Sequence, residues 1–212
     1  MQQNSPPLRP RRIPAELLRN ARVLSNREEI LPLLPKRKVF VEIGVALGDF
    51  SELILRECDV EKFVAIDLFV LHNAKKMWGG RVQEVLQGQN HEDFYRQRFE
   101  QHVSDGRMEI IKGDSIDALQ KIPDQGADIF YVDANHSYDA VKSELSIIKK
   151  KITPSGWIIL NDYTMVDWLT GEQYGVIQAT NEFMIDEKWE MIYFALHNGM
   201  FCDVALRKVQ EI

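Results

Sequence analysis

The sequence predicts an α/β protein with an open, doubly wound sheet of seven strands, mostly parallel and ending in an antiparallel hairpin. Short apolar runs, several ending in glycine or aspartate, alternate with helical patterns along the chain. This alternation is typical of right-handed crossovers and of a parallel sheet covered on both faces. Two further strand-like runs, 189–196 and 200–209, are joined by His197-Asn198-Gly199, which is a hairpin signal.

Each remaining element has its own local signal. The five strands expected before the hairpin are 38–44, 62–67, 108–113, 127–133 and 156–162. The expected helices are 26–34, 49–58, 91–103 and 137–151. Asn26 is the expected N-cap of the first helix, with Glu28 and Glu29 in its first turn.

The stretch between Asp67 and Met108 is longer than a simple crossover needs, which indicates an insertion at about 69–103. It follows the carboxyl end of a strand, where open α/β sheets bind ligands. We therefore expect residues 69–90 to form a mobile lid, hinged at Gly79-Gly80. A structural elaboration without lid function is the alternative.

Length and composition limit the possible functions. A chain of 212 residues accommodates one α/β domain, expected over 25–212, after an N-terminal arm, 1–24. The arm is expected to be partly flexible or packed on a partner subunit in a homo-oligomer. The net charge of -6 argues against a nucleic-acid partner, and no apolar run approaches the roughly 20 residues of a membrane span. Two cysteines far apart cannot form a disulfide framework or a four-ligand zinc site, so Cys58 and Cys202 are interpreted as reduced thiols of a cytoplasmic protein. No apolar h-region follows the arm, which is therefore not a secretory signal.

A glycine turn, Glu42-Ile-Gly-Val-Ala-Leu-Gly48, follows the first of these strands. Gly44 and Gly48 permit a tight turn and close backbone approach to a ligand, although a plain strand-to-helix turn would look similar. Asp67 ends the next strand, where an acidic residue can accept both ribose hydroxyls of an adenosine. A pyrophosphate fits poorly here because Asp49 follows the turn at once. Glu42 suits ammonium and sulfonium charges, which favours S-adenosylmethionine over NAD.

Five segments carry a family resemblance. They are Glu42-x-Gly-x-x-x-Gly48, Ile66-Asp67, Gly113-Asp114-Ser115, Asp133-Ala-Asn-His-Ser-Tyr138 and Pro154-Ser-Gly-x-Ile-Ile-Leu-Asn-Asp162. In this order they resemble the motifs of class I S-adenosylmethionine-dependent methyltransferases, in a family that includes small-molecule and sugar O-methyltransferases of natural-product pathways. The resemblance covers roughly residues 26–208 and implies a Rossmann-like fold.

The resemblance also implies a cofactor-binding set. The methionine part would be bordered by Glu42, Gly44 and Gly48, the ribose bound by Asp67, and the adenine flanked by Asp114 and Ser115. Ser51 and Asp133 complete the set. Two residues depart from the pattern: Ala46 stands where many relatives have glycine, and Asn161 where relatives have histidine or aspartate.

Asp133 and Asp162 both end parallel strands, so their side chains should converge at one edge of the sheet. Together with the Asn161 carbonyl they offer hard oxygen ligands suited to Mg²⁺ or another divalent ion. Helix capping or cofactor binding by the two aspartates is the alternative. Asp162 is also a catalytic candidate, expected to position the acceptor oxygen.

His136 is the expected general base, because an unperturbed imidazole titrates near neutrality. Capping of the helix that begins near Ser137 is the competing interpretation of this histidine. The predicted function is methyl transfer to a small hydroxylated acceptor, such as a sugar or natural product. An NAD-linked oxidoreductase and a non-catalytic cofactor-binding protein are the alternatives.

Overall fold

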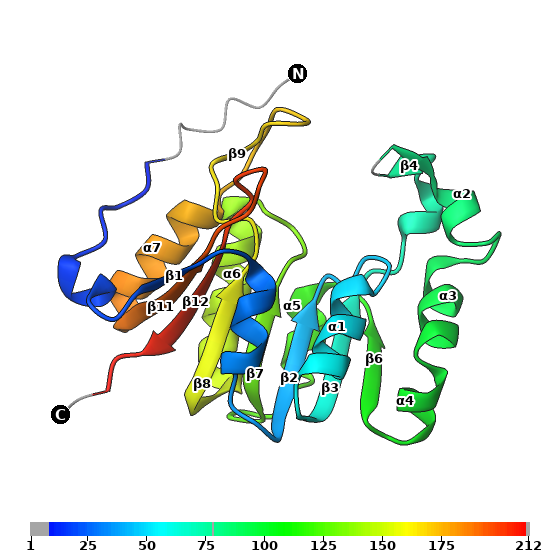
Figure 1. Cartoon of the computed structure of the whole chain (residues 1–212), viewed down its shortest axis with the longest axis horizontal. Helices are drawn as coiled ribbons and strands as arrows, with labels where there is room; N and C mark the ends of the chain where they lie inside the picture. Colours follow the sequence, from blue (N-terminus) through cyan, green and yellow to red (C-terminus); the bar gives the residue numbers. More distant parts are fainter. Residues whose placement is uncertain (1–8, 78, 211–212) are drawn as a thin grey trace.

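An eight-stranded sheet forms the centre of the molecule. The computed structural model describes residues 9–77 and 79–210, and the strand order of this sheet is β1-β11-β12-β8-β7-β2-β3-β6 (Figure 1). The strands are β1 (Arg22–Leu24), β2 (Lys38–Ile43), β3 (Val60–Asp67), β6 (Met108–Lys112), β7 (Ala127–Val132), β8 (Ile152–Leu160), β11 (Trp189–Ala195) and β12 (Asp203–Lys208). Neighbours from β8 to β6 are parallel, whereas β12 is antiparallel to both β8 and β11. The predicted doubly wound sheet with its C-terminal antiparallel hairpin is confirmed.

The strand number differs from the prediction by one. The eighth strand, β1, comes from the segment expected to be an arm, and it pairs in parallel with β11. This strand has only three residues, of which the first two are exposed and the third is buried. It therefore lacks the alternation of apolar and polar residues by which a strand is recognised in a sequence. Arg11 also pairs with Asp186 at 2.6 Å, so residues 9–24 contact their own chain. Residues 1–8 lie outside the described residues, and the expected flexibility and homo-oligomer contact of the arm stay predictions.

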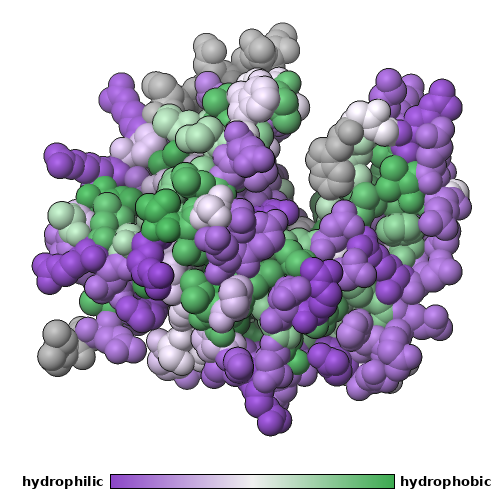
Figure 2. Space-filling view, in the orientation of Figure 1, coloured by the Kyte–Doolittle hydropathy of each residue, from purple (hydrophilic) through white to green (hydrophobic). Residues whose placement is uncertain are grey.

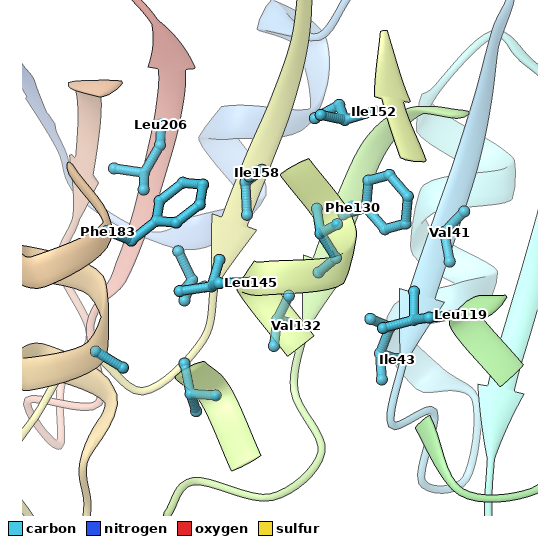
Figure 3. Packing of buried hydrophobic residues seen from close by; sticks show 14 of the residues in the cluster. Val41, Ile43, Leu119, Phe130, Val132, Leu145, Ile152, Ile158, Phe183 and Leu206 are labelled. Carbon is cyan, nitrogen blue, oxygen red and sulfur yellow. The ribbon is translucent and has the colours of Figure 1, made fainter. Parts of the chain in front are cut away.

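Helices cover both faces of the sheet. Helices α5 (Ser115–Gln120), α6 (Tyr138–Lys151) and α7 (Val176–Glu187) cover one face, and α1 (Asp49–Glu57) with the 3-10 helix η2 (Arg27–Leu33) packs on the other. Side-chain alternation along β2 explains this arrangement, because Val41 and Ile43 pack with the first group while Phe40 packs with the second. Figure 3 shows the first of these layers, in which Leu145 lies near Ile158 and Phe183.

The predicted insertion contains several short elements. They are the 3-10 helix η3 (Leu71–Asn73), β4 (Lys76–Met77), β5 (Gly80–Arg81), α2 (Val82–Val85), α3 (His91–Arg98) and α4 (Glu100–Ser104). A helical segment over 91–103 is therefore confirmed, with a break at Phe99. In Figure 2 a notch separates the projection formed by β4 and α2 from a second projection, the hairpin of β9 (Val166–Asp167) and β10 (Glu172–Gln173).

The sheet reverses its winding between β2 and β7. The chain runs outward from β2 through β3 to β6 and then returns to β7 on the other side of β2. Open α/β sheets bind ligands at the carboxyl ends of the strands at this reversal. In the part of the chain that the structure describes, no helix is long and apolar enough to cross a membrane.

Candidate active site

The turn between β2 and α1 depends on two glycines for different reasons. Gly44 has a φ of +85°, and a Cβ there would lie 2.1 Å from the carbonyl oxygen of Asp133. Gly48 has a φ of +88°, and its Cβ would lie 2.6 Å from the Phe99 ring. Gly44 is thus required where β2 and β7 approach each other, whereas Gly48 is required for the insertion to pack on the turn.

Asp67 is held rigidly at the end of β3. Its carboxylate accepts hydrogen bonds from the backbone nitrogens of Val45 at 3.0 Å and Phe69 at 2.6 Å. A carboxylate offers about four acceptor positions, so positions remain for a ligand. The two backbone bonds also fix Asp67 against the glycine turn, which places both parts of the predicted cofactor site on one surface.

A cavity of about 330 Å³ opens on that surface. Its lining comes from the carboxyl ends of four neighbouring strands: Ile43, Gly44, Ala46, Ile66, Asp67, Leu68, Val70, Leu71, Gly113, Asp114, Ser115, Asp133, Ala134 and Asn135. Five of the eight predicted cofactor-binding residues are therefore brought together here: Gly44, Asp67, Asp114, Ser115 and Asp133. Asp114 caps α5 by accepting from the Ile116 nitrogen, and the Ser115 hydroxyl donates to Glu144 at 2.6 Å.

The other three, Glu42, Ser51 and Gly48, do not line this cavity. Glu42 is buried beneath α1, where the Ser51 hydroxyl donates to it and the Tyr95 hydroxyl donates to Ser51 at 2.8 Å. Burial raises the pKa of Glu42 to about 8, with Asp133 acting in the same direction and the hydrogen bond from Ser51 opposing it. Glu42 and Ser51 thus form a buried chain behind the cavity wall, and their predicted contact with the cofactor stays a prediction.

His136 lies between the two strand-end aspartates. Its Nε2 atom is 3.6 Å from Oδ1 of Asp133 and 3.5 Å from Oδ2 of Asp162. Burial lowers the pKa of His136, but Asp133 and Asp162 outweigh it and hold the pKa above 6.5. The competing interpretation as a helix cap is wrong, because the Ser137 side chain caps α6 by accepting from the Ala140 nitrogen.

Asp162 follows β8 with a φ of +54°. Burial raises its pKa to about 6, and the negative charge of Asp133 acts in the same direction. A non-glycine residue in the left-handed region costs free energy, and such residues cluster at functional sites. Asp133 and Asp162 both lie within 3.6 Å of His136 Nε2, so the two side chains converge as the sequence predicts.

The amide nitrogen of Asn161 is committed to the polar cluster behind the site, while its carbonyl oxygen, the predicted metal ligand, makes no bond there. Its side chain is buried, and its Nδ2 donates to the Tyr131 hydroxyl at 3.2 Å and to Asp203 Oδ1 at 3.0 Å. Within residues 9–77 and 79–210, no three histidine, cysteine, aspartate or glutamate side chains converge as metal ligands. The ion stays a prediction, and we assign it no part in the mechanism.

Sequence reasoning missed the polar cluster behind these residues. The Tyr131 hydroxyl donates to Asp203 at 2.8 Å and accepts from Arg27 at 3.1 Å. Burial raises the pKa of Asp203 to about 7, while Arg27 opposes that rise. Of these residues, Tyr131 is the one that the sequence could have indicated, because the hydroxyl of a tyrosine inside a buried strand needs a hydrogen-bond partner.

Tyr174 was missed as well. Its ring stacks on the imidazole of His136, with centroids 4.5 Å apart and planes 11° from parallel. It lies 38 positions after His136 in a segment without a clear periodic pattern. Only the folding of the β9–β10 hairpin over the sheet brings the two rings together.

A sheet of this order, with a cavity at the reversal beside β2, is the fold of class I S-adenosylmethionine-dependent methyltransferases. The sequence profile described as Methyltransferase domain matches residues 41–163, more than half of the chain, and the chain belongs to this family. The cavity fits the cofactor of that class, because Asp67 offers free acceptor positions and Gly44 lets the turn pack closely against the backbone of Asp133, so that both line one cavity.

The chain is similar to individual proteins only at low sequence identity. An uncharacterized protein, R132, of Acanthamoeba polyphaga mimivirus is 22% identical over 148 residues, 69% of this chain and 59% of that protein. The Bacillus cereus O-methyltransferase, solved with S-adenosylhomocysteine, superposes with a TM-score of 0.56 at 17% identity over 86% of this chain and 80% of that chain. An O-methyltransferase family protein from Burkholderia thailandensis gives 0.58 at 11% identity over 87% and 56% of the two chains. At these identities the structures support the fold alone.

Proposed function

We propose that this chain transfers the methyl group of S-adenosylmethionine to a hydroxyl oxygen of a small acceptor, with His136 as the general base. One observation carries the proposal: His136 Nε2 is buried between two carboxylates, without a hydrogen-bond partner among the described residues, and one of these carboxylates, Asp133, lines the cavity. A buried imidazole nitrogen in this position is suited to taking a proton from a bound hydroxyl.

Cofactor binding is assigned to the cavity residues. The free acceptor positions of Asp67 would receive the ribose hydroxyls, and Asp114 would lie at the opposite end beside the adenine. When bound, S-adenosylmethionine supplies a methyl group already activated by its sulfonium charge. The chain then contributes alignment of the acceptor oxygen and removal of its proton.

Proton removal follows from the charges around His136. The acceptor hydroxyl gives its proton to Nε2, and the carboxylates of Asp133 and Asp162 stabilise the imidazolium that forms. The base is active only in its neutral form. Because its pKa is raised, the rate should increase with pH around a value above 6.5. An acidic limb centred below 6.5 would contradict this assignment.

The cofactor assignment is tested by calorimetry with S-adenosylhomocysteine and with NAD. Asp67→Ala should weaken S-adenosylhomocysteine binding by roughly 2–4 kcal/mol, because two charge-assisted hydrogen bonds are lost. Asp59→Ala is the matched control, since Asp59 is exposed and precedes the amino end of β3, the opposite end of the strand from Asp67. Tighter binding of NAD than of S-adenosylhomocysteine would overturn the proposal in favour of the oxidoreductase alternative.

The base is tested by single-turnover methyl transfer to a panel of hydroxylated acceptors, including sugars and phenols. His136→Ala should lower the rate about 10²–10⁴-fold and leave S-adenosylhomocysteine affinity almost unchanged. His102→Ala, on α4, serves as the control. Normal cofactor binding without transfer to any acceptor would favour the non-catalytic alternative. Full activity of His136→Ala would move the base role to Asp162.

A further inference from the structure

A group of exposed apolar side chains stands beside the proposed acceptor site. The apolar rim consists of Met165, Val166, Trp168 and Leu169 around β9 and Met200 in the loop before β12. Trp168 is 61% exposed, Leu169 69% and Met200 65%. Contiguous apolar residues exposed in this way mark binding surfaces, whereas isolated ones are common on any protein.

The rim is held in place by contacts between its two segments. Trp168 Nε1 donates to the carbonyl of Gly199 at 2.7 Å, and its ring stacks on Phe201 with centroids 6.3 Å apart. Asp167 fixes the hairpin tip, because its carboxylate accepts from the Thr170 hydroxyl at 2.7 Å. The exposed side chains are therefore presented by an ordered surface formed by the hairpin and the 197–201 loop.

The base of the same hairpin is attached to His136. Tyr174 stacks on the imidazole, and its backbone nitrogen donates to Met165 at 2.9 Å. The next residue, Gly175, donates to the carbonyl of His136 at 2.7 Å, and a Cβ there would lie 2.2 Å from the Tyr138 nitrogen. The contacts hold the rim and His136 at a fixed separation on one end of the sheet, so both are available to a single extended molecule.

The charges near the rim limit what can bind there. Asp167 and Glu172 belong to the hairpin. Burial raises the pKa of Tyr174 to about 12, and Asp162, Asp167 and Glu172 act in the same direction. The chain as a whole carries a net charge of -6. Anionic lipid and nucleic acid would be repelled by this surface. A free sugar would leave Met165, Leu169 and Met200 without apolar partners.

We infer that the acceptor is a hydroxylated compound without negative charge that carries an extended apolar portion, and that the apolar rim binds this portion while the hydroxyl lies at His136. The inference rests on the proposed function, because it places the acceptor oxygen at His136. It narrows that function from any small hydroxylated acceptor to one with a polar end and an apolar body.

The test uses 1-naphthol as the probe and calorimetry on the full chain saturated with S-adenosylhomocysteine. The parent should bind 1-naphthol, with no detectable heat for glucose. Trp168→Ala and Leu169→Ser should each weaken 1-naphthol binding about tenfold, the usual effect of losing one apolar contact. Their S-adenosylhomocysteine affinity should stay unchanged. Val23→Ser is the matched control, because Val23 is 69% exposed on the edge strand β1.

Three results would overturn the inference. They are absence of 1-naphthol binding to the parent, equal loss in Val23→Ser and the rim variants, or tighter binding of glucose than of 1-naphthol. Sedimentation provides a further check: a parent dimer that the rim variants dissociate would identify the rim as an interface between copies. Each of these results leaves cofactor binding and the His136 assignment intact, so failure of the inference is distinguishable from failure of the proposed function.

Discussion

The buried carboxyl of Glu42 should make the folded state less stable as the pH rises. Burial raises its pKa from 4.5 to about 8, which corresponds to about 5 kcal/mol at roughly 1.4 kcal/mol per pH unit. The folded state therefore holds the proton more tightly than the unfolded state. Below pH 4.5 the group is neutral in both states and has no effect. Its destabilising effect grows from pH 4.5 and levels off above pH 8.

Glu42→Gln removes this titration and keeps the shape and the hydrogen bond from Ser51. Between pH 5.5 and 8.5 the parent should lose about 3 kcal/mol of unfolding free energy relative to the variant. Urea denaturation at pH 5.5, 7.0 and 8.5 measures the difference. Glu61→Gln is the control, since Glu61 is exposed on β3. A parent and a Glu42→Gln variant whose stabilities change in parallel with pH would show that Glu42 is not held neutral by burial.

Three other predictions follow from the site. Gly44→Ala should lower the free energy of unfolding by several kcal/mol and abolish S-adenosylhomocysteine binding, because its Cβ would lie 2.1 Å from Asp133. Gly106→Ala, with open space around it, should lower that free energy by only about 1 kcal/mol. Equal losses for the two variants in urea denaturation would refute the clash at Gly44. Residues 69–90 should gain protection from hydrogen exchange when cofactor and acceptor bind, and unchanged protection would make the segment structural. If Asp162 anchors a divalent ion, EDTA should inactivate the parent and Asp162→Asn should lose its response to Mg²⁺; a parent indifferent to EDTA would leave Asp162 only the role of aligning the acceptor.

The sequence predicts best what depends on strand ends. Gly44, Asp67 and Asp133 each follow a buried apolar run, and parallel strands bring their carboxyl ends to one edge of a sheet. The sequence predicts less well which way a side chain within a strand points. Glu42 lies only two residues before Gly44, yet it is still inside β2, on the same face as Phe40, where α1 covers it and Ser51 bonds to it away from the cavity.

Contacts between distant segments could not be predicted. Arg27 and Asp203 meet at Tyr131 only because β12 joins the sheet beside β8 and η2 packs across the strands. Tyr174 reaches His136 through an irregular hairpin. Both contacts depend on how distant segments pack in three dimensions, and the local periodicity of the sequence does not predict such packing.

The pairing of β1 with β11 has a consequence for synthesis of the protein. Asn20 and Glu190, which are 170 residues apart, form a side-chain hydrogen bond of 2.7 Å next to this pairing. At about 5–20 residues per second, the ribosome needs roughly 10–30 seconds to make the intervening chain. During that time the apolar side chains of η2 have no β11 to pack against. Translation speed and chaperone supply should therefore affect the yield of this protein more than its equilibrium stability would suggest.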